Sequence, residues 1–390
     1  MTLKLAHKFF LSLIIILSVG SLPACTAVTS VSTPAGMVTS TMVPTKTRVP
    51  AATNALTAEP SATLTPLPTI SFATETISST NIDQMKELHV RELAGKPGNF
   101  FSQRLSFTAD GHTVVATNIT KIYVWDGTTG QPIAAFNQPS YIWNITISPN
   151  RKIVASFDDN GVLKLWNVQT GEEKYTLAHK VVWTTVWSLA FSPDNMILAS
   201  GDFDGKVTFW DTHAGKELNN IVDPNGSATS IAFSPDGKVL AIGTQDRITL
   251  WDIVSKQLIR TLDFGTKQDE FEGIRRVFFS PDGGMIAATH TKNIAMVWDV
   301  SSGKKLSTIV GQPVLVRACE GALAFSPDSK IIATGNDDAG GIILWDSLAN
   351  KELRTIGSEK CIPMDLDFLN RGSVLEIGCN NGTIQFWGLP

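Results

Sequence analysis

The side chains that could carry catalysis are present in this chain, but their spacing forms no catalytic or metal-binding motif. His179, Ser200 and Asp204 supply the imidazole, hydroxyl and carboxylate that a nucleophilic hydrolase requires. No nucleophile elbow, histidine pair, phosphate-binding loop or dinucleotide fingerprint accompanies them. Asp337 and Asp338, before Ala-Gly-Gly, are typical of a polar turn rather than a cation loop. The sequence therefore predicts no catalytic residues, no metal site and no cofactor, and so a protein that is not an enzyme.

The elements that position these side chains follow from a repeat. Tryptophans recur every 41 to 47 residues, at Trp125, Trp166, Trp210, Trp251, Trp298, Trp345 and Trp387. A fixed period of this length indicates one supersecondary unit copied along the chain. Turns such as Ser234-Pro235-Asp236-Gly237 have type I turn chemistry and separate two apolar runs, and a third run ends on the tryptophan. The sequence predicts an all-β fold, a seven-bladed β-propeller of four-stranded antiparallel blades.

These repeats resemble the WD40 family, whose repeats carry Ser-Pro-Asp-Gly turns and close on Trp-Asp. Five of the seven tryptophans precede Asp, and Trp166-Asn167 and Trp387-Gly388 are departures. The resemblance covers roughly residues 85 to 390 and implies a propeller that docks peptides and proteins. It also implies a structural hydrogen-bond network in the third blade, rather than a catalytic triad, through His179, Ser200, Asp204 and Trp210.

The end of the chain predicts how the ring closes. Only three residues follow Trp387, so the last repeat has no fourth strand of its own. An open edge would leave backbone donors and acceptors unpaired. We therefore expect residues about 88 to 93 to pair with the Trp387 strand, and residues 78–390 to form the propeller.

Three cysteines lie in the last two repeats. Cys361 opens the first strand of its hairpin and Cys379 ends the second, so antiparallel pairing brings them near each other. A disulfide between them is the first choice. A bond between Cys319 and Cys361 across adjacent blades is the runner-up, and three free thiols are the third alternative.

The N-terminal region predicts an anchored, extracytoplasmic protein. Lys4 and Lys8 precede a short apolar stretch that ends before Cys25, which is the layout of a secretory signal. The site resembles the lipobox of bacterial lipoproteins, with Pro23 as a departure. This implies a signal peptide at 1–24 and a lipidated Cys25 that holds the protein on a membrane of the cell envelope. An ordinary signal peptide and an uncleaved anchor are the alternatives. Residues 25–77, rich in Thr, Ser, Pro and Ala, are expected to form a disordered tether.

Binding is expected at the loops that ring the channel mouth. The first-strand positions four residues before the closing Phe or Ile are Gln103, Trp143, Trp187, Thr229, Arg275, Gly321 and Met364. Trp143 and Trp187, with Tyr141, Trp183 and Arg275, form a candidate patch, because aromatic and arginine side chains are usual binding anchors. The alternative is that these tryptophans pack between blades. The acidic insertion at 263–273 is a second candidate contact loop.

The charge pattern narrows the class of partner. The net charge is −4 and no basic tract is present, which argues against nucleic acid. We expect a monomeric propeller that acts as a scaffold for a protein or peptide, with a glycan as the alternative ligand. The competing class is a propeller enzyme, a hydrolase or lyase, with its site at the channel mouth.

Overall fold

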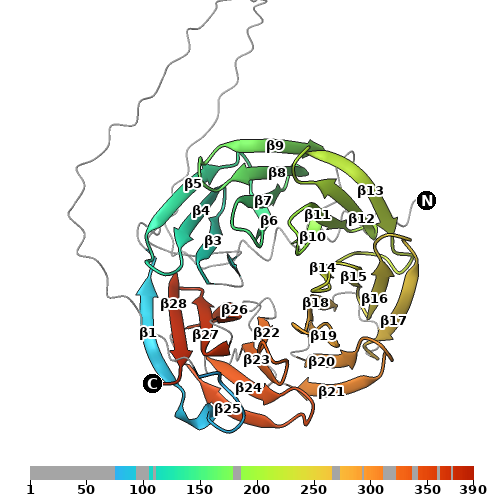
Figure 1. Ribbon diagram of the computed structural model, residues 1–390. Coiled ribbons are helices and arrows are strands. Elements are labelled where there is room, and N and C mark those ends of the chain that lie inside the picture. The colour runs from blue at the N-terminus through green and yellow to red at the C-terminus, as the bar shows by residue number, and fades with distance from the viewer. Residues whose placement is uncertain are drawn as a thin grey trace, which may run out of the picture. The chain divides into compact units, whose positions relative to one another are not determined.

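The computed structural model describes residues 75–93, 105–108, 111–178, 186–265, 273–291, 294–310, 322–335, 341–357, 361–369 and 372–390. Its strands form seven four-stranded antiparallel sheets, which are arranged as blades around a central opening (Figure 1). The all-β class and the seven-bladed propeller expected from the repeats are confirmed. Among the described residues, no helix has the length and apolar character needed to cross a membrane.

Each blade runs from an inner strand at the channel to an outer strand at the rim. Blades 1 to 3 contain β2 (Leu105–Phe107), β3 (Thr113–Asn118), β4 (Lys121–Asp126) and β5 (Pro132–Asn137); β6 (Ile142–Ile147), β7 (Ile153–Asp158), β8 (Val162–Asn167) and β9 (Glu173–Ala178); and β10 (Val186–Phe191), β11 (Ile197–Asp202), β12 (Lys206–Asp211) and β13 (Lys216–Val222). Blades 4 and 5 contain β14 (Ser230–Phe233), β15 (Val239–Gly243), β16 (Arg247–Asp252) and β17 (Leu258–Asp263); and β18 (Ile274–Phe279), β19 (Met285–His290), β20 (Ile294–Asp299) and β21 (Lys305–Val310). Blades 6 and 7 contain β22 (Leu323–Phe325), β23 (Ile331–Gly335), β24 (Ile342–Asp346) and β25 (Glu352–Ile356); and β26 (Pro363–Leu369), β27 (Val374–Cys379), β28 (Thr383–Gly388) and β1 (Lys86–Glu92).

In six blades the Asp or Asn after the repeat tryptophan caps the turn from the third to the fourth strand. Asp211 Oδ1 accepts hydrogen bonds from the N–H groups two and three residues further on, at 2.7 and 2.8 Å. Asn167 does the same in blade 2, at 2.9 and 3.1 Å, so the departure from Trp-Asp keeps the cap. In blade 7 the fourth strand is β1, so Trp387-Gly388 is not followed by a turn to the fourth strand of its own blade.

The fourth strand of blade 7 comes from the N-terminal side of the propeller. β1 pairs antiparallel with β28, with Arg91 opposite Ile384 and Glu92 opposite Thr383. In Figure 1 the blue β1 lies along the red β28, so sequence-distant ends share one sheet. This is the pairing expected for residues about 88 to 93, and the strand begins slightly earlier, at Lys86.

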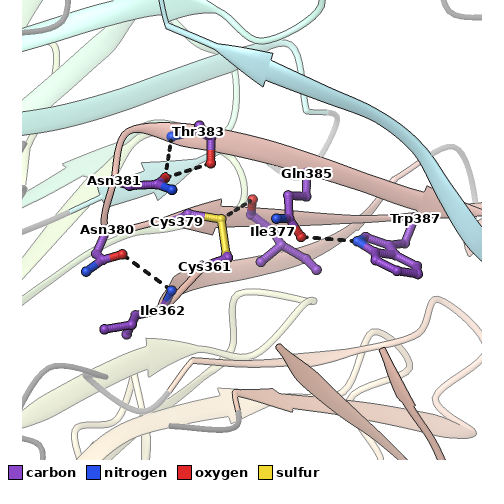
Figure 2. Close-up of a disulfide and its surroundings, with 9 residues drawn as sticks. All are labelled: Cys361, Ile362, Ile377, Cys379, Asn380, Asn381, Thr383, Gln385 and Trp387. Carbon is purple, nitrogen blue, oxygen red and sulfur yellow. Dashed lines mark hydrogen bonds between the residues drawn. A yellow bond between two sulfur atoms is a disulfide. The ribbon is translucent and has the colours of Figure 1, made fainter. Parts of the chain in front are cut away.

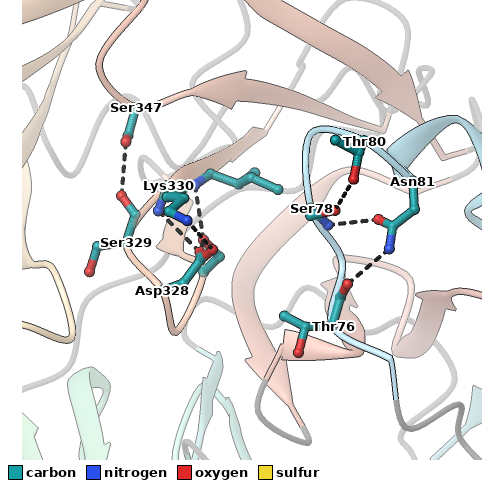
Figure 3. A network of polar contacts seen from close by, with 10 residues as sticks. Thr76, Ser78, Thr80, Asn81, Asp328, Ser329, Lys330 and Ser347 are labelled. Carbon is teal, nitrogen blue, oxygen red and sulfur yellow. Dashed lines mark hydrogen bonds and ion pairs between the residues drawn. The ribbon is translucent and has the colours of Figure 1, made fainter.

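Residues 75–85, which we call the strap, pack against the propeller before β1 begins. The strap contains the short 3₁₀ turn η1 (Ile82–Gln84). Ile77, Ile82 and Met85 are at most 2% exposed and belong to the apolar core of blades 6 and 7. Asn81 Oδ1 accepts the N–H of Ser78 at 2.7 Å and fixes the shape of the strap (Figure 3). Ile77 was expected in the tether, but its side chain is fully buried, so the folded part starts before residue 78.

Outer-strand side chains tie neighbouring blades together at the rim. Arg260 of β17 donates to two carbonyls in the turn between the third and fourth strands of blade 5, at 2.7 and 2.9 Å. Tyr175, at the same register position in β9, contacts the corresponding turn of blade 3. Arg354, at that position in β25, donates to the Ile82 carbonyl at 2.6 Å. The strap therefore takes the place of the turn that blade 7 lacks.

A disulfide joins the first two strands of blade 7. Cys361 lies just before β26 and Cys379 ends β27, with a Cα–Cα distance of 5.0 Å (Figure 2). Beside it, Ile362 and Asn380 exchange two hydrogen bonds, at 3.0 and 3.3 Å. The bonded pair is the first choice from the sequence, so Cys361 is not joined to Cys319. Cys319, and the N-terminal region that includes Cys25, lie outside the described residues.

Candidate functional site

Four of the residues expected at the channel mouth stand on irregularities of the inner strands. In blade 2 the register between β6 and β7 shifts across Trp143, which has no cross-strand partner. The same shift occurs at Trp187 in blade 3, Arg275 in blade 5 and Met364 in blade 7. A β-bulge inserts an extra residue and re-aims the side chains beside it. The bulges therefore occur at the starts of these inner strands, which are the strand ends that the sequence analysis assigned to the channel mouth.

The three remaining mouth positions differ from these four. Thr229 Oγ1 donates to the carbonyls of Gly243 and Ile274, at 3.0 and 2.8 Å. Thr229 therefore links blades 4 and 5 instead of presenting a free hydroxyl. Gln103 and Gly321 lie outside the described residues.

Tyr141 and Trp143 form the described part of the expected aromatic patch. Their ring centroids are 5.0 Å apart at an interplanar angle of 61°, an edge-to-face pair. Trp143 is half-buried and packs against the core cluster of blades 2 and 3, so it combines interblade packing with an exposed part. Trp183 lies outside the described residues, and for Trp187 the structure describes only the backbone, in β10.

Ile119 adds an apolar side chain that the sequence analysis missed. It lies in the turn between β3 and β4, is 57% exposed and has a φ of +49°. Branched side chains rarely occupy this left-handed conformation, which costs on the order of 1 to 3 kcal/mol. The Ile119 carbonyl accepts the N–H of Ile142, the residue between Tyr141 and Trp143, at 2.7 Å. The turn is therefore held next to the aromatic pair.

Blade 5 brings positive charge to the mouth. Arg276 Nη1 lies 2.8 Å from Asp365 Oδ1 of blade 7, and its guanidinium lies 4.8 Å from the Phe278 ring centroid. The ion pair joins blade 5 to blade 7 across the inner strand of blade 6. At the position equivalent to Arg276 and Asp365, blade 6 has the small side chain of Ala322. Arg275, on the bulge, is half-buried and forms no ion pair or hydrogen bond with any other described residue.

The hydrogen-bond network expected in blade 3 is described only in part. Trp210 Nε1 donates to Ser200 Oγ at 2.8 Å, inside the blade. Asp204 is exposed, in the turn between β11 and β12, and His179 lies outside the described residues.

Blade 2 contains a longer network of this kind. Trp166 Nε1 donates to Ser156 Oγ at 2.8 Å, and Ser156 donates to Gln138 Oε1 at 2.5 Å. Gln138 directly follows the outer strand of blade 1, as His179 follows that of blade 2. Glutamine therefore stands after the outer strand of blade 1 where histidine stands after that of blade 2, and a search for His could not find it.

Blade 4 builds the network with a carboxylate. Trp251 Nε1 donates to Thr249 Oγ1 at 2.9 Å, and Thr249 donates to the Asp223 carboxylate. Asp223 directly follows the outer strand of blade 3 and is 2% exposed. These hydroxyls are buried and already bonded, so their role is to join successive blades.

The structure describes only the two ends of the acidic insertion at 263–273. Asp263 ends β17 and Gly273 precedes β18, while Asp269, Glu270 and Glu272 lie outside the described residues. Within the described segments, no group of three or more His, Cys, Asp or Glu side chains could hold a metal ion.

Four segments of the chain match the WD40 family, described as WD domain, G-beta repeat: residues 130–167, 171–211, 215–252 and 303–346. The chain is similar to small ribosomal subunit protein RACK1y of Oryza sativa subsp. japonica, 28% identical over 155 residues, which are 37% of this chain and 42% of the relative. It is similar to WD repeat-containing protein SL1-17 of Schistosoma mansoni, 30% identical over 124 residues, 31% of this chain and 40% of the relative. Eukaryotic translation initiation factor 3 subunit I of Aspergillus niger is 31% identical over 71 residues, 18% of this chain and 21% of the relative. The chain thus spans less than half the length of each. Four repeats of the chain thus match the WD40 repeat model, and the chain is similar in part to WD-repeat proteins.

Proposed function

We propose that this protein is a non-catalytic scaffold whose propeller binds a protein or peptide at the channel mouth. The observation that carries the proposal is the inner-strand bulge that blades 2, 3 and 5 share, with Trp143, Trp187 and Arg275 on it. The fourth bulge residue, Met364, is buried in the core of blades 7 and 1. Aromatic and arginine side chains are enriched at protein interfaces and are common hot spots. The serine and threonine hydroxyls beside the repeat tryptophans are used inside the blades.

We further propose that a lipid on Cys25 holds the propeller outside the cytoplasm of a bacterial cell, at the end of the 25–77 tether. This part rests on the sequence of the first 25 residues and on the composition that follows them. The disulfide between Cys361 and Cys379 supports it, since such bonds persist in oxidising compartments. Labelling with a radioactive fatty acid tests the anchor: label should enter the wild-type chain and not Cys25→Ala, and equal labelling would contradict lipidation at this residue.

The binding function is tested by affinity capture from a cell-envelope fraction. Wild type, a Trp143→Ala, Trp187→Ala double variant and a rim variant, Ile259→Ala, serve as baits. Ile259 is 51% exposed on β17, far from the mouth end of the inner strands, and is a matched loss of exposed apolar surface. We expect a partner that wild type and the rim variant recover equally and the double variant loses. Equal recovery by all three baits would show that the mouth is not the binding surface.

A further inference from the structure

Arg275 is the one mouth residue whose charge calls for a partner from outside the described chain. Arg275 is half-buried, and a charged side chain that has lost part of its hydration is stabilised when an anion or other hydrogen-bond acceptors pair with it. Arg275 forms no ion pair or hydrogen bond with another described residue. Its position on a bulge, at the start of β18, places it at the mouth and not inside a blade.

Two described carboxylates, on β26 and in the turn between β15 and β16, are engaged with other arginines. Asp365 pairs with Arg276 at 2.8 Å, and its side chain is 11% exposed. Asp246, in the neighbouring turn of blade 4, receives two hydrogen bonds from Arg247, at 2.8 and 2.9 Å. Pairing therefore balances Arg276 and Arg247 and leaves the positive charge of Arg275 uncompensated among the described groups.

We propose that Arg275 binds a carboxylate of the partner, so that the polypeptide held at the mouth carries an acidic side chain or its own C-terminal carboxylate there. The planar guanidinium presents parallel N–H donors that match the two oxygens of a carboxylate. Arg276, the next residue, is already paired with Asp365, so it does not compete with Arg275 for the carboxylate of the ligand.

Apolar side chains on the other side of the central opening would bind a second part of the same peptide. Blades 1 and 2 hold Ile119, Tyr141 and Trp143, and β6 lies across the central opening from β18 (Figure 1). A peptide that spans the mouth would place an apolar side chain on this sector and its carboxylate on Arg275. The inference rests on the proposed function and adds the chemistry of the partner.

The test uses a displayed library of random peptides selected on the full chain. Wild type, Arg275→Gln and Arg247→Gln are compared, since Arg247 is an arginine at the start of β16 whose charge is already paired with Asp246. We expect wild type and Arg247→Gln to enrich peptides with an acidic residue at a fixed spacing from an apolar one. Arg275→Gln should lose the acidic preference and keep the apolar one. Selected acidic peptides should bind Arg275→Gln at least about tenfold more weakly, with less dependence on salt.

The outcomes separate this inference from the proposed function. Enriched peptides without an acidic residue, or an acidic preference that survives in Arg275→Gln, would contradict carboxylate binding by Arg275. The mouth would then remain a binding surface. Peptides whose binding is unaffected by Trp143→Ala and Arg275→Gln alike, or no enrichment by wild type, would overturn both. A circular-dichroism melt of each variant shows that its propeller is intact.

Discussion

Replacing Ile77 by alanine should destabilise the whole propeller, although the residue lies at the end of a segment with the composition of a tether. Ile77 is fully buried in the core cluster of blades 6 and 7, and its N–H donates to the Gly372 carbonyl at 2.9 Å. Truncating a buried isoleucine to alanine leaves a cavity and costs about 2 to 5 kcal/mol. A residue in a disordered tether would change the free energy of unfolding by less than about 0.5 kcal/mol.

The assay is equilibrium unfolding in urea, followed by tryptophan fluorescence. Val254→Ala is the matched control, because Val254 is 88% exposed in a turn of blade 4 and should leave the unfolding midpoint unchanged. A clear drop in the midpoint for Ile77→Ala alone is expected. If both variants unfold at the wild-type midpoint, the strap is not part of the folded ring.

Hydrogen exchange then separates the strap from general destabilisation. Arg354→Ala removes the bond to the Ile82 carbonyl, and Arg260→Ala removes the equivalent bonds between blades 4 and 5. A hydrogen bond from a charged donor contributes about 1.5 to 3 kcal/mol when buried and less at the rim. Arg354→Ala should speed exchange of the β1 amides, whereas Arg260→Ala should not. Equal protection of β1 in both variants would refute the view that the strap secures the closing strand.

Three further predictions concern the interior and the turns. Reducing the bond between Cys361 and Cys379, or replacing both by alanine, should lower stability by about 2 to 4 kcal/mol, and a non-reduced proteolytic digest should yield the linked peptides. Gln138→Ala should cost about 1 to 3 kcal/mol, measured by urea unfolding, because it leaves the buried Ser156 hydroxyl without its acceptor. Hydrogen bonds, most of all from Ser302, lower the pKa of Asp299 from 3.8 to about 2, so the stability that this carboxylate contributes is complete above pH 3.8 and is lost as the pH falls towards 2. Asp299→Asn should therefore show a smaller loss of stability over that pH range than wild type, and an equal loss would contradict the role of this carboxylate.

The blade architecture could be predicted because its determinants are local and repeated. A Trp followed by a turn-capping Asp or Asn recurs in six of the seven blades, and the capping bonds of Asp211 and Asn167 show why either residue serves. The pairing of the N-terminal strand with the Trp387 strand could likewise be predicted from the number of strands in the repeats. These features need no knowledge of which blades touch.

Other features depend on contacts between segments that are distant in sequence, and composition could not reveal them. Ile77 stands among Thr and Ser, so the local composition assigns it to the tether. Its side chain nevertheless packs in the apolar core of blades 6 and 7. Gln138 and Asp223 stand at the position after an outer strand where blade 2 is followed by His179, because any group that accepts a hydrogen bond from the hydroxyl completes the network there. The bulge at Arg275 appears only when the pairing of β18 with β19 is known.

The proposal that binding occurs at the mouth rather than at the rim also draws on the contrast between positions that repeat and positions that vary. The capped turns after the repeat tryptophans perform the same task from blade to blade, and the rim side chains that bond to neighbouring turns do so in blades 2, 4 and 6. The bulge position has the same backbone irregularity in four blades but carries Trp143, Trp187, Arg275 and Met364. A packing role accounts for Met364, which is buried in the core of blades 7 and 1, whereas Trp143 and Arg275 are half-buried. Different side chains on a common backbone feature instead give the mouth an asymmetric surface, apolar on blade 2 and cationic on blade 5, which can fix both the direction and the register of a bound peptide.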